Sequence, residues 1–325
     1  MKGVVLVSFF VVAVSAHSLL EQDGIKFQSF KLEHGKTYQN PAEETARFAI
    51  FRDNLRSIER HNARYEQGLE TYTQGINKFA DMTHAEFKAM LKLQYRGKPA
   101  MKSTKNFELP KEATVPDSID WREKNAVTEI KNQGFCGACW AFAVTGTTEG
   151  AYAIKTGNLT SLSEQQLIDC ALEMNIGCQG GQLEENFPYI EEYGLESEAD
   201  YPFEGTDGTC RYDSTKVVTY VSSYVAFNGS EDKLKEAVGT AGPVAVGIDA
   251  DYIQLYESGI FSDSDCNPKA LDHAVLVVGY GTENGTDYWL IKNSWGASWG
   301  ESGYFRFLRG VNQCGIQADN TYPII

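Results

Sequence analysis

The sequence predicts an α+β fold in which a helical lobe is followed by a β-barrel-like lobe, with a separate helical leader in front of both. Three observations support this. Apolar and small residues recur at helical spacing over 139–157, β-rich segments bounded by Gly, Asn and Pro dominate after residue 242, and all seven cysteines lie at or beyond residue 136. A helical half followed by a β half implies two lobes meeting at an interface, where clefts usually form.

The first sixteen residues have the layout of a secretory signal peptide. A basic residue, Lys2, precedes the apolar run 4–14, and small residues end the segment at Ala16, after which cleavage is expected. Eleven residues rise only about 16 Å as a helix, roughly half a hydrocarbon core, so a membrane anchor is the weaker alternative and no membrane span is expected. We therefore predict a signal peptide at 1–16 and export to an oxidising compartment, where cysteines pair.

The net charge of -15 is unevenly distributed along the chain. From Val115 onward 12 Lys and Arg stand against 31 Asp and Glu, whereas the remainder has 17 against 13. The acidic body disfavours nucleic-acid binding, because phosphates would be repelled. The acidity either serves solubility alone or attracts the mildly basic leader, and the charge counts do not decide between the two.

The leader contains a predicted helix, at 43–62, whose face mixes polar and apolar residues. Steps of four, four, three, four and four place six residues on this face: Glu43, Arg47, Phe51, Asn54, Ile58 and Asn62. A face used only for core packing would be uniformly apolar. The mixture therefore predicts packing combined with specific polar bonds.

The rest of the leader has three parts. An extended stretch at 71–83 is followed by a short amphipathic helix at 84–93, and the segment 95–114 is polar and basic, with two prolines. We predict that 95–114 is a linker exposed to proteolysis. The body then begins at about Val115.

The body is predicted to be helical first and strand-rich later. One helix follows Cys139 and stops at Gly157, and another starts at Ser163, where the order Ser-Glu-Gln-Gln predicts a capping box. The β-rich segments lie at 243–250, 273–280, 287–295 and 303–310.

Cys136 and Cys139 lie three residues apart in the stretch NQGFCGACWAF. They can be half of a zinc site with Cys170 and Cys178, a redox couple, or one bridge cysteine beside one reactive cysteine. Export and the lack of a second CxxC pair disfavour zinc, and the lack of a parallel βαβ pattern disfavours a thioredoxin-like couple. Seven cysteines also leave one thiol without an internal partner, so we expect a reactive cysteine and no metal or cofactor.

Histidine is scarce in the body, where His273 is the only one after Val115. Alone, a histidine flanked by AVLVVGY is typical of a hydrogen-bonded core residue. A cysteine in the first turn of a helix, however, lies at the positive end of the helix dipole, and a protonated imidazole beside it would stabilise the thiolate. Twenty residues further on, Asn293 supplies an amide able to hold the second ring nitrogen. The sequence thus offers a nucleophile, a base and an orienting group.

These residues resemble the signature of papain-like cysteine peptidases, and of their cathepsin L-like branch in particular. His273 and Asn293 follow Cys139 of the CGACW motif by 134 and 154 residues. The helix face at 43–62 matches the family's ERFNIN pattern, and the segment 75–81 matches its GxNxFxD motif. The resemblance covers nearly the whole chain.

The resemblance implies a preproenzyme with a signal peptide at 1–16, an inhibitory propeptide at 17–114 that blocks the cleft, and a peptidase domain at 115–325. It implies that Cys139 is the nucleophile of peptide-bond hydrolysis through an acyl-enzyme. The six other cysteines would form the family's disulfides, Cys136–Cys178, Cys170–Cys210 and Cys266–Cys314. Three sequons, each a candidate glycan site in a secreted protein, lie at Asn158, Asn228 and Asn284.

The resemblance also assigns the catalytic surroundings. His273 would be the acid and base, held by Asn293, with Trp295 shielding their bond. The Gln133 amide and the backbone N–H of Cys139 would form the oxyanion hole. Further substrate-binding residues by resemblance are Gly180, Gly181, Gln182, Leu183, Gly247, Leu271, Asp272, Ala274 and Asp319.

By resemblance, the residues aligned with the pocket for the substrate's P2 side chain are Gln182, Leu183, Gly247, Leu271, Ala274 and Asp319, whereas Gly180 and Gly181 lie at the edge of the cleft. Gly180 and Gly181 offer bare backbone on which an extended substrate can pair, whereas Asp319 falls at the pocket floor, where relatives often have an apolar or small residue. We hypothesise that Asp319 lets this otherwise apolar pocket accept Arg or Lys, with room left by Gly247. The single body histidine also excludes a histidine-bearing occluding loop, which favours endopeptidase action.

We therefore expect a cysteine endopeptidase made as an inactive zymogen and activated at acid pH. Its expected partners are protein and peptide substrates, its own propeptide and cystatin-like inhibitors, and it is expected to be a monomer in a lysosome or an acidic digestive lumen. An inactive binding protein on the same fold would lack one of the predicted catalytic residues. A different Cys–His enzyme, such as an acyl transferase, would not need the leader.

Overall fold

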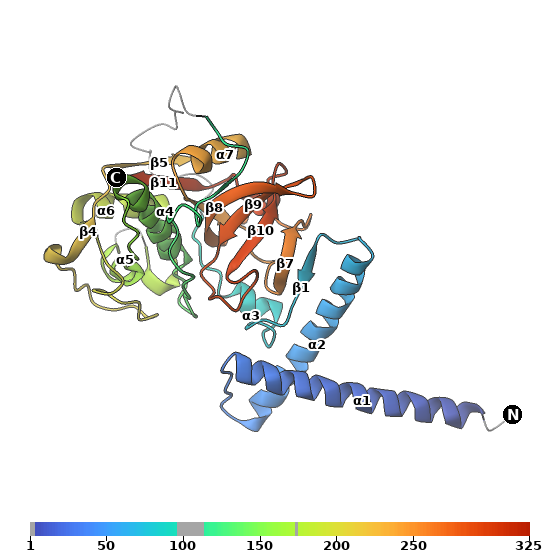
Figure 1. The fold of residues 1–325 in the computed structure, drawn as a ribbon. Helices are drawn as coiled ribbons and strands as arrows, with labels where there is room; N and C mark the ends of the chain where they lie inside the picture. The colour runs from blue at the N-terminus through green and yellow to red at the C-terminus, as the bar shows by residue number, and fades with distance from the viewer. Residues whose placement is uncertain (1–3, 96–113, 173–174) are drawn as a thin grey trace.

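A computed structural model describes residues 4–95, 114–172 and 175–325. The body forms a mainly helical lobe and a lobe built on a large β-sheet, and the leader lies against the sheet lobe and extends away from it (Figure 1). The helices are α1 (Val4–Glu33), α2 (Pro41–Glu66), α3 (His84–Lys88), α4 (Cys139–Thr156), α5 (Glu164–Cys170), α6 (Phe187–Tyr193) and α7 (Glu231–Thr240). The strands are β1 (Tyr72–Gln74), β2 (Ile119–Asp120), β3 (Leu195–Glu196), β4 (Val217–Thr219), β5 (Ser223–Phe227), β6 (Val244–Ile248), β7 (Tyr256–Phe261), β8 (His273–Glu283), β9 (Thr286–Lys292), β10 (Tyr304–Leu308) and β11 (Asn320–Ile324). The predicted α+β fold is confirmed.

The helical lobe is organised around α4, which is buried from Cys139 to Gly150. This helix packs on α5 and on β8 and β11 of the sheet lobe. A Cβ at Gly146 would lie 2.9 Å from the end of the Leu276 side chain, so a larger residue in α4 would require Leu276 of β8 to shift. The helix ends as predicted at Gly157, whose φ of 78° is the left-handed conformation that favours glycine.

The sheet lobe has β8 near its middle. The strand order is β1-β7-β10-β9-β8-β6-β11-β5, and β2 pairs with β8 outside this path. Antiparallel pairing of β6 with β8 sets Ile248, at the end of β6, opposite His273, at the start of β8. Since α4 packs on β8, the N-terminus of α4 and the start of β8 meet between the lobes.

The leader adds a strand to this sheet. β1 pairs antiparallel with β7, while α1 and α2 cross at the outer end of the leader (Figure 1). The two helices share an apolar cluster with Ala80 and one body residue, Leu255. The leader helices contribute Phe27, Phe30, Phe51, Leu55 and Ile58 to it.

The mixed face of α2 makes both kinds of contact that its sequence predicted. Phe51 and Ile58 are buried. The Nδ2 group of Asn54 donates to the carbonyl oxygens of residues 80 and 82 at 2.8 and 2.9 Å. Asn62 donates to the carbonyl of Gln74 and accepts from its N–H, at 2.8 and 2.9 Å. These bonds attach the GxNxFxD segment to the helix.

The capping box predicted at Ser163 is only half formed. The Ser163 hydroxyl accepts from the backbone N–H of Gln166 at 2.9 Å. The Gln166 side chain does not return to the Ser163 N–H; its Oε1 accepts from the N–H of Glu196 at 2.8 Å. The second half of that prediction was wrong because Gln166 is buried against the start of β3, which offers it tertiary partners instead.

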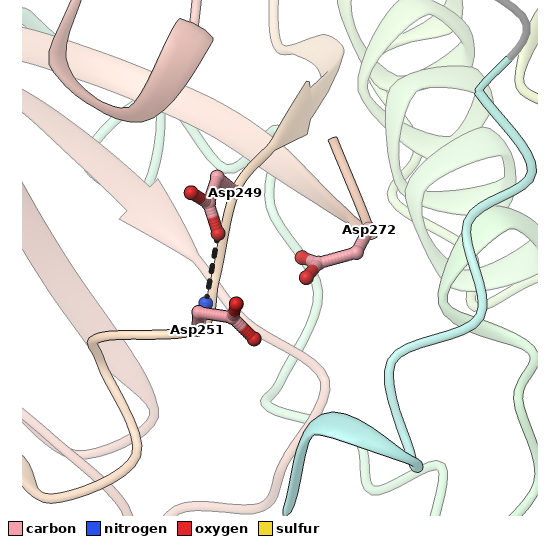
Figure 2. A group of neighbouring side chains, drawn as sticks. All are labelled: Asp249, Asp251 and Asp272. Atoms are coloured by element: carbon pink, nitrogen blue, oxygen red, sulfur yellow. Dashed lines mark hydrogen bonds between the residues drawn. The ribbon is translucent and has the colours of Figure 1, made fainter. Parts of the chain in front are cut away.

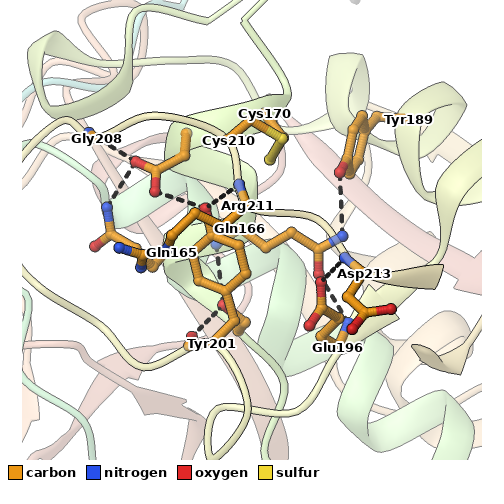
Figure 3. The surroundings of a disulfide bond; sticks show 12 residues. Gln165, Gln166, Cys170, Tyr189, Glu196, Tyr201, Gly208, Cys210, Arg211 and Asp213 are labelled. Carbon is orange, nitrogen blue, oxygen red and sulfur yellow. Dashed lines mark hydrogen bonds between the residues drawn. A yellow bond between two sulfur atoms is a disulfide. The ribbon is translucent and has the colours of Figure 1, made fainter. Parts of the chain in front are cut away.

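The loop that follows β3, at 197–213, is attached to α5 by a disulfide and by buried polar bonds (Figure 3). Cys170, the last residue of α5, is bonded to Cys210. The buried Asp169 carboxylate accepts from the Tyr201 hydroxyl at 2.7 Å and from the N–H of Gly208 at 2.8 Å. The loop therefore depends on α5 for its position.

The structure describes only part of two predicted segments. The predicted linker 95–114 lies almost entirely outside the described residues, and the apolar run 4–14 lies in the first part of α1. Within the described part of the chain, no helix has both the length and the apolar character needed to cross a membrane.

Candidate active site

Cys139 is the first residue of α4 and is buried with a free thiol. The backbone N–H groups of Ala274, Trp140 and Lys92 lie near its sulfur and favour the thiolate. The position of Ala274 places the start of β8, and with it the neighbouring His273, beside the sulfur. Lys92 belongs to the leader, so the leader backbone lies directly on the predicted nucleophile.

The six other cysteines are joined in three disulfides, whose pairs are those that the resemblance implied. They are Cys136–Cys178, Cys170–Cys210 and Cys266–Cys314. The Cys136–Cys178 bond holds the loop before α4 to the chain that continues into Gly180 and Gly181. It therefore braces both sides of the groove beside Cys139.

His273 is held on its far side by Asn293. The Nε2 atom of His273 lies 2.9 Å from Oδ1 of Asn293, and the same oxygen accepts from the N–H of Ser294 at 2.8 Å. Because the amide oxygen can only accept, Nε2 carries a proton, which leaves Nδ1 of the neutral ring as the acceptor. A neutral ring in this tautomer can receive a proton from the thiol.

Trp295 covers this pair from one side. Its ring stacks on His273 with centroids 4.6 Å apart. Phe79 and Phe87 of the leader meet the other side of Trp295 edge-on, at 5.3 and 5.4 Å. The GxNxFxD motif thus reaches the predicted catalytic histidine through a single intervening ring.

Gln133 is buried with a fixed amide orientation. Its Oε1 accepts from the Ser294 hydroxyl at 2.6 Å, and its Nε2 donates to the carbonyl of Cys136 at 2.9 Å. One N–H of the amide therefore remains for a substrate oxygen. Sequence reasoning missed Ser294 as the orienting group, although it directly follows Asn293 in the motif KNSWG.

Burial favours the uncharged forms of the predicted catalytic pair in the full-length chain. Desolvation raises the pKa of the Cys139 thiol to about 11, and it lowers the pKa of the His273 imidazole to about 4 against the opposite effect of the Asn293 bond. The expected thiolate–imidazolium pair is therefore not the favoured state here. A helix N-terminus contributes only about 0.3–2 kcal/mol, too little to outweigh burial.

The leader runs through the groove beside Cys139. The N–H of Leu93 donates to the carbonyl of Asp272 at 2.9 Å, and the N–H of Gln94 donates to the carbonyl of Gly181 at 2.9 Å. A Cβ at Gly180 would lie 2.2 Å from the Lys92 carbonyl oxygen. The bare backbone at Gly180 thus permits the close pairing that its sequence suggested.

Leu93 fills the predicted P2 pocket. A Cβ at Gly247 would lie 3.0 Å from Leu93, 3.1 Å from Leu271 and 3.3 Å from Asp319, so these four residues surround one space. The apolar cluster around Leu93 also includes Leu183 and Ala274. The backbone N–H of Gln182 does not point into this pocket, since it donates to the Asn175 side chain at 2.9 Å.

A second carboxylate, which sequence reasoning missed, acts on Asp319. Burial, and after it the nearby carboxylate of Glu184, raises the pKa of Asp319 to about 8, and Glu184 itself is 2 % exposed. Asp319 is therefore protonated in acid while the leader occupies the pocket. Glu184 follows the predicted residues 180–183 directly, and only its burial distinguishes it from the many surface acids of this chain.

Asp272 contributes to the groove through its backbone carbonyl, whereas its carboxylate faces Asp249 and Asp251. The sequons at Asn158, Asn228 and Asn284 are all exposed.

Comparison with known proteins agrees with this geometry. The profile described as Papain family cysteine protease matches residues 115–324, and the profile described as Cathepsin propeptide inhibitor domain (I29) matches residues 27–87. A cathepsin L of Sarcophaga peregrina is 43% identical over 327 residues, covering 96% of this chain and 95% of its own. Digestive cysteine proteinase 1 of Homarus americanus is 45% identical over 307 residues, covering 92% and 94%. The solved digestive procathepsin L 3 from the larval midgut of Tenebrio molitor superposes with a TM-score of 0.86 at 46% identity, covering 93% of this chain and 99% of its own.

The chain belongs to the papain family of cysteine proteases. It is a cysteine-type endopeptidase of the cathepsin L-like group, made as a zymogen whose N-terminal propeptide is an intramolecular inhibitor.

Proposed function

We propose that Cys139 is the nucleophile, His273 the general acid and base, and Asn293 the group that orients His273. The observation that carries this proposal is the position of the one free thiol, at the N-terminus of α4 and beside Ala274, the residue after His273. After the propeptide leaves, water reaches both groups, and proton transfer from sulfur to imidazole becomes favourable.

The proposed reaction has two halves. The Cys139 thiolate attacks the scissile carbonyl carbon, and the imidazolium of His273 gives its proton to the departing amine, which leaves an acyl-enzyme. The neutral imidazole then takes a proton from water, and the hydroxide attacks the thioester and releases the carboxylic acid and the sulfur. The free N–H of Gln133 and the N–H of Cys139 stabilise the negative oxygen in both halves.

The catalytic assignment is tested by substitution and by thiol labelling. Cys139→Ala should abolish peptidase activity, self-processing and labelling by a thiol-reactive epoxide. Gln133→Ala should lower kcat by about 100 to 1,000-fold, because one oxyanion donor is lost. Ser294→Ala should lower kcat less, since the Gln133 amide remains but is free to turn. Epoxide labelling that persists in Cys139→Ala would exclude this assignment.

We further propose the processing scheme of a signal peptide at 1–16, a propeptide at 17–114 and a mature enzyme at 115–325. The family match that begins at residue 115 supports the last boundary. N-terminal sequencing of the mature enzyme should find a start close to Val115.

Acid activation is proposed on the electrostatics of the propeptide. Within the described residues, Lys88–Asp251 is the ion pair between propeptide and peptidase domain. Other pairs stabilise the propeptide itself, including Arg47–Glu86. Protonation of these carboxylates weakens both kinds of pair, so self-processing should be faster at about pH 4 to 5 than at pH 7. A rate that does not change with pH would remove this explanation.

The P2 pocket is proposed to accept apolar side chains and, once Asp319 is ionised, Arg or Lys. A carboxyl with a raised pKa is neutral below that pKa and charged above it. The ratio of kcat/KM for P2-Arg to that for P2-Leu should therefore rise between pH 5 and pH 8 in the parent enzyme. The rise should be absent in Asp319→Ala; an Asp319→Ala enzyme that cleaves P2-Arg substrates as well as the parent refutes the hypothesis.

The biological setting is proposed in the same terms. The protein acts as a monomer on protein and peptide substrates, either in a lysosome or in an acidic digestive lumen, and cystatin-like proteins are inhibitors that this cleft would accept. Glycans are proposed at the three exposed sequons. The relatives described as digestive proteinases favour the lumen, and immunolocalisation with an antibody to the mature enzyme distinguishes the two compartments.

A further inference from the structure

Three carboxylates converge beside the active site, on the face that the propeptide covers (Figure 2). Since Ile248 of β6 pairs with His273 of β8, Asp249 and Asp272 lie next to each other just beyond the paired strands. Asp251 is turned back toward them, because its N–H donates to the Asp249 carboxylate at 3.1 Å. One oxygen from each of the three carboxylates lies within 4.8 Å of the others.

This cluster already holds a cationic group, and that group is removable. The ammonium of Lys88, in α3 of the propeptide, donates to Oδ2 of Asp251. Its pKa is raised by Asp251 first and also by Asp272 and Asp249, so all three acids act on it. When the propeptide leaves, Lys88 leaves with it.

The cluster also retains an unused ligand atom. Asp251 is 8 % exposed, yet its Oδ1 has no hydrogen-bond partner among the described residues. The other two carboxylates accept backbone N–H groups, Asp249 from Asn267 at 2.6 Å and Asp272 from Ala250 at 2.9 Å. Those bonds fix the positions of the carboxylates without cancelling their charge. Once Lys88 has left, no ion pair of the described residues supplies these acids with another cation, and the neighbouring carboxylates repel one another unless a cation binds there.

We propose that Asp249, Asp251 and Asp272 form a Ca²⁺ site in the processed enzyme, and that the ammonium group of Lys88 occupies this site in the zymogen. The inference rests on the proposed function in one respect, namely that the propeptide departs. Carboxylate oxygens are hard ligands, typical of Ca²⁺ and Mg²⁺. Ligands on opposite sides of Mg²⁺ are at most about 4.2 Å apart, whereas those around Ca²⁺ reach about 5 Å, so the observed spacing suits Ca²⁺.

The direct test is calorimetric titration of metal-free protein with Ca²⁺ alone at pH 7.5. The processed enzyme should bind one Ca²⁺ with a Kd on the order of 10⁻⁴ to 10⁻³ M, the range of modest oxygen-ligand sites. Mg²⁺ should bind at least about tenfold more weakly, because its shorter bonds do not span the cluster. Ten millimolar Ca²⁺ should also raise the thermal midpoint of the processed enzyme by about 3–10 °C.

Variants assign the binding to these residues. Asp251→Asn should weaken Ca²⁺ binding at least about tenfold, whereas Asp265→Asn, an exposed aspartate in the same region, should leave it unchanged. In a Cys139→Ala background, which prevents self-processing, the full-length chain should bind Ca²⁺ at least about tenfold more weakly than the processed enzyme. Adding Lys88→Met to that full-length chain should restore binding.

Two outcomes overturn the proposal: a processed enzyme that binds no Ca²⁺, or an Asp251→Asn enzyme that binds it like Asp265→Asn. A full-length chain that binds as tightly as the processed enzyme overturns the role of Lys88. Hydrolysis of a peptide substrate is measured on the same samples. A parent processed enzyme that hydrolyses the peptide but binds no Ca²⁺ counts against the metal site alone, while a parent processed enzyme without hydrolysis counts against the proposed catalytic function.

Discussion

The contacts that join the two lobes of the peptidase domain differ in chemistry from the contacts that join the propeptide to that domain. Where the lobes meet, Lys131 donates to the buried carboxylates of Glu149 in α4 and Glu164 in α5 at 2.9 and 2.6 Å. Lys292 of β9 joins this cluster through Thr128, which accepts from Lys292 at 2.9 Å and donates to Glu149 at 2.7 Å. The propeptide instead uses the backbone of β1, the ring of Phe79 and the side chain of Leu93.

The difference matches the lifetimes that the two interfaces need. A buried charge cluster is costly to open, because each ion would be left without its partner. Backbone pairing at a sheet edge and a few apolar contacts can be exchanged for water and substrate with far less penalty. The lobes therefore stay together during catalysis, whereas the propeptide can be replaced by a peptide that uses the same groove.

The largest expected difference concerns Cys139 itself. With a thiol pKa of about 11 in the full-length chain, only about one molecule in 10⁴ carries the thiolate at pH 7. In the processed enzyme, the exposed pair with His273 should make most of the thiol reactive at that pH. Alkylation by iodoacetamide at pH 7 should therefore be about 10⁴-fold faster after processing.

The direction in which the alkylation rate of Cys139 changes with pH is a second test of the effect of propeptide burial. Because burial raises the thiol pKa, reactivity in the full-length chain should keep increasing with pH well above pH 8. The processed enzyme should reach its plateau at much lower pH. Identical profiles in the two forms would contradict the role assigned to propeptide burial. Alkylation of the full-length samples must be measured before self-processing begins, and Cys139→Ala serves as the unlabelled control.

Breaking the charge cluster between the lobes should give the next largest effect. Lys131→Met removes the cation that bonds Glu149 and Glu164 directly and leaves Lys292, which bonds neither, beside them, and we expect a loss of about 3–5 kcal/mol in the free energy of unfolding. Denaturant unfolding of the Cys139→Ala chain, with and without Lys131→Met, measures it. Lys233→Met, at an exposed position, is the matched control and should change stability by less than about 0.5 kcal/mol. A small effect of Lys131→Met would mean that the cluster does not hold the lobes together.

The propeptide interface should be weakened most by Phe79→Ala. Phe79 is 2 % exposed and packs on Trp295, and truncating such a ring costs about 3–5 kcal/mol. The open state of the propeptide should therefore become at least about 100-fold more populated. Cleavage of the Cys139→Ala chain by a trace of active enzyme at pH 7 measures this population. Leu32→Ala, at a position 85% exposed, should cleave at the parent rate.

The contrast between the regions also explains which features the sequence made predictable. The periodic face of α2, the helix end at Gly157 and the strand at His273 follow from local pattern, and the structure contains them. The partner of Gln166 did not follow, because Glu196 reaches it only through the tertiary fold. The same holds for Glu184, whose effect on Asp319 depends on two segments that are distant in sequence.

The charge state of the predicted catalytic pair was also beyond the sequence. The helix dipole and the lone histidine are local features, and both favour an ion pair. The burial that opposes them arises in the tertiary fold, where the propeptide runs through the groove beside Cys139 and its residues Phe79 and Phe87 pack on Trp295. No residue close to Cys139 or His273 in the sequence indicates that the propeptide covers this part of the groove.

The smallest predicted effect tests how acid opens the propeptide interface. The bond from Arg47 holds the pKa of the Glu86 carboxyl below its ordinary value. A carboxyl with a lowered folded-state pKa contributes stability that is complete above its unfolded pKa of about 4.5 and is lost as the pH falls through the folded value. Glu86→Gln removes this carboxylate permanently, so self-processing at pH 7 should accelerate by a few fold and its dependence on pH should become shallower. Glu59→Gln removes an exposed carboxylate of the same propeptide and serves as control. If Glu86→Gln keeps the parent's pH profile, the acid response resides in other ion pairs, such as Lys36–Asp81 within the propeptide or Lys88–Asp251, which joins the propeptide to the peptidase domain.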